Sequence, residues 1–194
     1  MEFQMIQADF DGACEPRNPG GHGTYDVVVR VDGEIVYRHG GYCGHGRHMS
    51  NNVAEYWGAI HTLTEAVKYD GIITLRGDSR MVIMQLGPDP ALGRTRWKAR
   101  RGLYLAVHKK AIKLVNQHRD RLRFQWIPRC DNEECDLLSK QVLINRGVQV
   151  LDRQKRSKQS QSIHSAIGGV FTDEDEEWSR LALLPHNPLD VSTT

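Results

Sequence analysis

Long apolar runs are missing from this chain. Apolar stretches are only a few residues long, as in Val27–Val29. A helix that crosses a bilayer needs about 20 consecutive apolar residues, so we expect no membrane association. The first residues also lack the basic segment and apolar segment of a secretory signal. We therefore expect a cytoplasmic protein.

Cysteine is scarce, and the four that are present are not spaced as metal ligands. No two of them form a Cys-x2-Cys pair, which argues against a zinc knuckle, and four thiols in 194 residues are too few for a disulfide scaffold. We interpret them as reduced, incidental residues: Cys14, Cys43, Cys130 and Cys135. With 39% hydrophobic and 26% charged residues, the composition also excludes collagen-like and wholly disordered chains.

Charge is segregated along the chain although the net charge is only +2. Residues 94–123 contain 11 Lys or Arg and one acid, whereas residues 1–93 contain 7 basic and 12 acidic residues. This pattern favours a polyanionic partner held beside a carboxylate-rich site. The alternative is a solvated helix face.

The hydrophobic pattern predicts an α/β fold. Strands are expected at Phe3–Phe10, Thr24–Val31, Glu34–Tyr42, Ile72–Leu75 and Leu122–Ile127, and helices at Asn51–Lys68, Ser79–Leu86, Leu103–His118 and Asn132–Asn145. Asp32-Gly33 predicts a hairpin turn between the second and third strands. This order indicates one mixed five-stranded sheet, with three antiparallel strands followed by two crossover-linked parallel strands and with flanking helices.

The composition changes near residue 151. We expect residues 1–150 to form the folded domain and residues 151–194 to form a flexible tail. The tail combines a polar segment, Arg153–Ser162, with an acidic run, Asp173–Glu177. Three roles stay open for it: folding back on the basic stretch, keeping the chain soluble, or docking another protein. The oligomeric state is also open.

Four carboxylates stand where strands are expected to end or helices to begin: Asp11, Glu55, Asp78 and Asp136. In an open α/β sheet these positions face one crevice. Clustered carboxylate oxygens suit Mg²⁺ or Mn²⁺. Any one acid alone is better explained as a surface residue, so the metal-site hypothesis depends on all four together.

The local sequences around these acids form four motifs in order: Phe10–Cys14 with Arg17–Gly21, then Ser50–Glu55, then Gly77–Ser79, and finally Trp126–Arg129 with Asn132–Asp136. Together they resemble type 1 ribonuclease H over about residues 3–146. The resemblance implies cleavage of the RNA strand of an RNA–DNA hybrid, with two divalent ions held by Asp11, Glu55, Asp78 and Asp136. The expected products carry a 5′-phosphate and a 3′-hydroxyl.

Substrate contacts are also implied by the resemblance. Asn18, Asn51 and Asn52 would contact the hybrid in its minor groove, where amides can recognise 2′-hydroxyls, and Ser50 would bind a phosphate of the DNA strand. The alternative for Asn51 and Asn52 is that they only cap the helix.

Three positions depart from the family pattern. Arg129 stands roughly where many members carry a mobile histidine, and it can hold a phosphate but cannot act as a base. Arg80 stands where relatives often have a glutamine that contacts the minor groove. Asp9 lies two residues before Asp11, on the same side of the strand, where it would support the ligands or be a solvated strand residue.

Two other functional classes stay open. One is a different metal-dependent nuclease of similar fold, such as a DNA resolvase or an exonuclease. The other is a hybrid-binding module without catalysis. Four intact carboxylates facing a polyanion argue against the second.

Overall fold

A computed structural model describes residues 4–88 and 95–150. Five strands form one sheet in the order β3-β2-β1-β4-β5. β2 pairs antiparallel with β1 and β3, while β4 pairs parallel with β1 and β5. The strands are β1 (Gln4–Glu15), β2 (His22–Val31), β3 (Glu34–His45), β4 (Gly71–Gly77) and β5 (Leu122–Trp126). The mixed sheet predicted from the sequence is thus confirmed.

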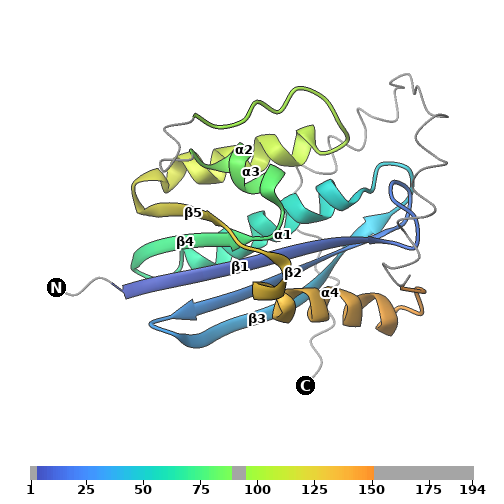
Figure 1. The fold of residues 1–194 in the computed structure, drawn as a ribbon, viewed down its shortest axis with the longest axis horizontal. Coiled ribbons are helices and arrows are strands. Elements are labelled where there is room, and N and C mark those ends of the chain that lie inside the picture. Colours follow the sequence, from blue (N-terminus) through green and yellow to red (C-terminus); the bar gives the residue numbers. More distant parts are fainter. Residues whose placement is uncertain (1–3, 89–94, 151–194) are drawn as a thin grey trace.

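Helices cover both faces of this sheet. Figure 1 shows α1, α2 and α3 on one side and α4 on the other. Their bounds are α1 (Asn51–Ala66), α2 (Arg80–Leu86), α3 (Leu105–Gln117) and α4 (Glu133–Asn145), with single 3-10 turns η2 (Arg119–Arg121) and η3 (Arg129–Asp131). Within the described part of the chain, no helix has the length and apolarity that crossing a bilayer requires.

The first strand is longer than the sequence indicated. Asp11 was expected just after the strand and residues 12–23 in a glycine-rich loop, but β1 continues to Glu15, which pairs with His22. The reason is the partner strand: β2 keeps pairing with β1 to this point, so backbone hydrogen bonds outweigh the weak strand propensity of glycine. Asp11 therefore lies within β1, opposite Asp26.

The main core lies between the sheet and the first three helices. It includes Phe10 of β1, Leu75 of β4 and Val107 of α3, all fully buried. Tyr56 and Leu63 of α1, which are seven residues apart and so lie on one face of the helix, are also buried. This packing holds α1 across β1, with the start of α1 beside the carboxyl end of β4.

The tail expected at residues 151–194 lies outside the described residues, and so does Phe3 of the predicted first strand.

Candidate active site

Three of the four predicted carboxylates meet in the structure. One oxygen from each of Asp11, Glu55 and Asp78 can be chosen so that all three lie within 4.8 Å of one another. Asp11 and Glu55 are 2% and 5% exposed, and Asp78 is partly exposed. Two of the three carboxylates are therefore buried, and the third is accessible to solvent.

Glycines allow Asp11 and Glu55 to come together. A Cβ atom on Gly12 would lie 2.2 Å from the Glu55 backbone nitrogen, and one on Gly58 would lie 2.6 Å from the Asp11 carbonyl oxygen. Both distances are far below van der Waals contact. The backbones of β1 and α1 thus touch at the two acids, which any larger residue would prevent.

Asp78 joins them through the sheet register. β1 and β4 run parallel, with Phe10 opposite Gly77, so the next residue of each strand is an acid. The predicted position after a strand end is correct for Asp78, which directly follows β4, and wrong for Asp11, which lies within β1. Trp126 at the end of β5 donates its indole N–H to the Asp78 carbonyl oxygen at 3.0 Å and so fixes the turn after β4.

Asp136 approaches from α4, on the other face of the sheet. The guanidinium of Arg129 lies between the two acids: Nη1 is 3.4 Å from Asp78 Oδ2, and Nη2 contacts Asp136 Oδ1. Lys140 pairs with Asp136 one helical turn later. Asp136 thus adjoins the three-acid cluster through a shared cation rather than by direct approach.

The donor set fits hard divalent cations. All three clustered groups are carboxylates, and Mg²⁺ binds oxygen ligands at about 2.0–2.1 Å, so two ligands of one ion are at most about 4.2 Å apart. The observed separations are within 4.8 Å, so small side-chain rotations would complete the coordination. The acids are suited to hold a metal ion, whereas a thiolate- or imidazole-binding metal would prefer other donors.

Asp26 is a buried acid that the sequence interpretation missed. It is fully buried beneath α4, directly across the β1–β2 pair from Asp11. Burial, helped by the negative charge of Asp11, raises its pKa from 3.8 to about 9. Asp26 is therefore neutral at pH 7. No local motif marks this position; only the tertiary structure buries it.

The predicted amides lie beside the acids. The Asn51 backbone N–H donates to Asn18 Oδ1 at 2.9 Å, and the Asn51 side chain donates to Glu55 Oε1 at 3.3 Å. Ser50 caps α1 by accepting from the Val53 N–H at 3.3 Å. The alternative in which Asn51 and Asn52 only cap the helix is wrong, because Ser50 has that role. The side chain of Asn52 is exposed.

Two further residues singled out in the sequence, Arg80 and Asp9, lie next to other charged or aromatic side chains. Arg80 lies 5.8 Å from the ring centroid of the exposed Trp97, in a cation–π contact. Asp9 is 4% exposed and pairs with Arg30 and Arg76. The solvated alternative for Asp9 is therefore wrong.

Some cations of the basic stretch at residues 94–123 contact the protein itself, and others are exposed to solvent. Arg121 is used internally, since it donates to the carbonyl oxygens of Gly71 and Tyr69. Lys110 lies 4.7 Å from the ring centroid of Trp57, against α1. Exposed cations remain on the segment before α3 and on its outer face, among them Lys98, Arg100 and Lys109.

Comparison with known proteins identifies the family. A family model described as reverse transcriptase-like matches residues 9–142. The chain belongs to this family.

One curated family relative is the bifunctional protein Rv2228c of Mycobacterium tuberculosis. It is 32% identical over 140 residues, which cover 72% of this chain and 35% of that protein. The chain thus matches about a third of the length of this relative.

Two solved structures are similar to this chain. RNase H1 from the halophilic archaeon Halobacterium salinarum is 30% identical with a TM-score of 0.59, covering 73% of this chain and 98% of that one. The N-terminal RNase H domain of Rv2228c, solved as a fusion with maltose-binding protein, is 28% identical with a TM-score of 0.59, covering 73% and 94%. These matches confirm the resemblance to type 1 ribonuclease H and the fold it implies.

Proposed function

We propose that residues 1–150 form a catalytic domain that hydrolyses the RNA strand of RNA–DNA hybrids. The observation that carries the proposal is the convergence of Asp11, Glu55 and Asp78, with Asp136 linked to Asp78 through Arg129. Membership of the reverse transcriptase-like family and 30% identity to an archaeal RNase H1 support it.

The carboxylates would serve as metal ligands rather than nucleophiles. Asp11, Glu55, Asp78 and Asp136 would hold two Mg²⁺ or Mn²⁺ ions together with the substrate. Such a pair supplies an activated water for in-line attack at phosphorus and stabilises the departing 3′ oxygen. The products would carry a 5′-phosphate and a 3′-hydroxyl. Burial of Asp11 and Glu55 restricts their movement, so these two would orient the site.

Specificity for RNA would come from the amides. The Asn51 side chain donates to Glu55 and the Asn51 backbone N–H donates to Asn18, so the amides that would recognise the minor groove lie next to the proposed ligands. Asn18, Asn51 and Asn52 would contact 2′-hydroxyls and base edges without reading sequence. Recognition and cleavage would thus concern neighbouring nucleotides.

Phosphates would be held by cations and a hydroxyl around this centre. Arg129 neutralises Asp78 and Asp136 in the structure and would turn toward a substrate phosphate when metal ions replace it. The phosphate backbone would be contacted by Arg80, which lies over the ring of Trp97, and by Ser50, which lies at the start of α1. The exposed cations before and along α3 would add salt-dependent affinity.

The cellular setting is part of the proposal. All four cysteines lie within the described residues and are thiols rather than disulfides. Reduced thiols are usual in the cytoplasm, the location we propose. A protein partner for the tail stays a prediction.

The test is cleavage by an Asp78→Asn variant. Single-turnover cleavage of a labelled RNA–DNA hybrid in Mg²⁺ should fall at least about 100-fold, roughly 2.7 kcal/mol of barrier, because a metal ligand loses its charge but keeps its shape. Hybrid affinity should stay within about threefold, since phosphate contacts dominate binding.

Asp120→Asn is the matched control. Asp120 is an exposed acid in η2, before β5, at the opposite end of the sheet from Asp78, and its loss should leave cleavage unchanged. Duplex DNA and duplex RNA complete the design, with Mg²⁺ present or omitted. Cleavage of duplex DNA would indicate a different nuclease of this fold, and hybrid binding without Mg²⁺-dependent cleavage would indicate a non-catalytic module. An Asp78→Asn rate within tenfold of wild type would refute the ligand assignment.

A further inference from the structure

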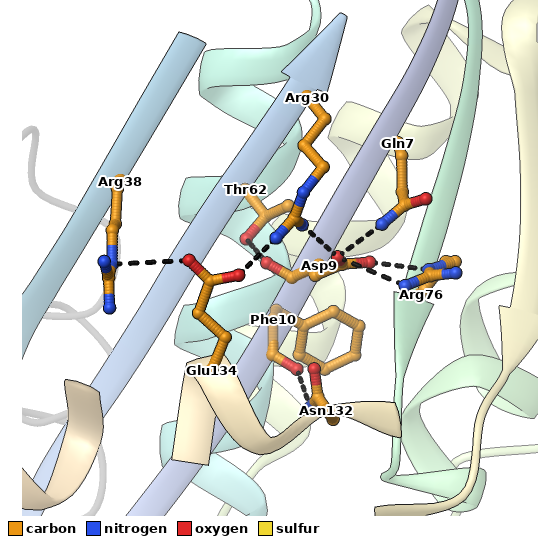
Figure 2. A network of polar contacts seen from close by, with 9 residues as sticks. All are labelled: Gln7, Asp9, Phe10, Arg30, Arg38, Thr62, Arg76, Asn132 and Glu134. Carbon is orange, nitrogen blue, oxygen red and sulfur yellow. Dashed lines mark hydrogen bonds and ion pairs between the residues drawn. The ribbon is translucent and has the colours of Figure 1, made fainter. Parts of the chain in front are cut away.

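A network of ion pairs runs across the sheet from Arg38 to Arg76 (Figure 2). Its centre is Asp9 of β1. Asp9 Oδ1 accepts from Arg76 Nε at 2.7 Å, and Oδ2 accepts from Arg30 Nη1 and from Gln7 Nε2, both at 2.8 Å. The carboxylate is thus surrounded by donors from β1, β2 and β4.

Arg30 extends this network of ion pairs from Asp9 to α4. While one terminal nitrogen contacts Asp9, the other contacts Glu134 Oε2. Glu134 lies in the first turn of α4, and its second oxygen is 3.6 Å from Arg38 Nε of β3. Arg30 therefore joins a buried strand acid to the start of the helix that carries Asp136.

A second contact anchors the same end of α4. The side chain of Asn132, which is 3% exposed, donates to the Phe10 carbonyl oxygen at 2.9 Å. Asn132 thus attaches the beginning of α4 directly to Phe10 of β1, and Glu134 attaches it to Asp9 through Arg30. Asp136 follows within the same turn, and its backbone N–H donates to the Asn132 carbonyl oxygen.

We propose that Arg30 is a positioning residue that sets the first turn of α4, and with it Asp136, relative to Asp11. The inference rests on the proposed role of Asp136 as a ligand. Asp136 is the one predicted ligand that α4 carries, whereas the other three come from β1, α1 and the residue after β4. Its distance from the other three depends on how α4 docks, and a displacement of about 1 Å can cost 100-fold in rate.

Loss of Arg30 should not leave Asp9 without charge compensation. Without Arg30, Asp9 keeps both its contacts to Arg76 and its hydrogen bond from Gln7. The buried acid therefore stays compensated and the fold should persist. What is lost is the ion pair between Arg30 and Glu134. The Glu134 side chain is 31% exposed, and so exposed an ion pair contributes little to stability by itself.

The experiment compares Arg30→Gln, Glu134→Gln and the double variant with wild type. Each single change should lower the single-turnover rate on a hybrid about tenfold while hybrid affinity stays within about twofold. The double variant should be no slower than the slower single variant, because both changes break one link. Arg38→Gln is the control: Arg38 makes a longer contact to the same Glu134 and is 48% exposed in its side chain, so its rate should stay within twofold of wild type.

Amide hydrogen exchange of the metal-free protein gives a readout that does not need activity. Exchange of the amides of residues 136–139 should accelerate in Arg30→Gln and Glu134→Gln, with α1 unchanged. Unaltered exchange there, or rate losses that add in the double variant, would overturn the proposal. If the wild type cleaves no hybrid, the proposed function fails, but the exchange measurement still decides whether Arg30 docks α4.

Discussion

Replacing Gly12 by alanine should separate Asp11 from Glu55. The added methyl group would lie 2.2 Å from the Glu55 nitrogen and 2.4 Å from the Ala54 carbonyl carbon. All of these neighbours are backbone atoms, so no side chain can rotate to make room. To reach ordinary contact, β1 and α1 must move apart by about 1 Å.

Two consequences follow from that displacement. Overpacking a core contact costs about 1–3 kcal/mol of stability. We expect a cost at the upper end of that range, because the new methyl group meets backbone atoms that cannot rotate away. For a chain of this size the melting temperature should fall by roughly 6–12 °C. Because Asp11 and Glu55 move with the two backbones, hybrid cleavage at a temperature where the variant is folded should fall about 100-fold.

Thermal unfolding and single-turnover cleavage measure the two effects separately. Gly46→Ala is the control, because a Cβ there has open space although the backbone has φ +105°. It should lower stability through backbone strain and leave the rate of the folded protein unchanged. A Gly12→Ala variant with the melting temperature and activity of wild type would refute the close-approach argument.

Two further predictions concern pH and substrate. Asp26→Asn should stabilise the fold above pH 4, because the folded protein keeps an Asp26 proton up to about pH 9 that the unfolded chain releases near 3.8. The gain should grow by about 1.4 kcal/mol per pH unit, reach roughly 4 kcal/mol at pH 7 and vanish below pH 4; urea unfolding at pH 4–8 checks this, and a pH-independent difference would contradict it. A single ribonucleotide within duplex DNA should be cleaved much more slowly than a hybrid with several consecutive ribonucleotides, because Asn18, Asn51 and Asn52 would contact successive 2′-hydroxyls. Equal cleavage rates on these two substrates would contradict that arrangement.

Much of the fold follows from local patterns. The β-branched run of β2 and the Asp32-Gly33 turn predict the hairpin, and the stripe through Tyr56 and Leu63 predicts the buried face of α1. These signals are local because period and turn chemistry act between near neighbours in sequence. The extension of β1 to Glu15 was missed because the pairing of Glu15 with His22 depends on a partner strand.

For the candidate site, the sequence alone determined which acids and amides are present and their order on strands and helices, since motif spacing is a property of the chain. Only the tertiary structure decided how they meet. Gly12 lets β1 touch α1, burial keeps Asp26 neutral, and Arg30 reaches Glu134 across 104 positions of sequence. Close contact, burial and long-range ion pairs arise from packing between segments that are distant in sequence, and a local sequence pattern does not specify that packing.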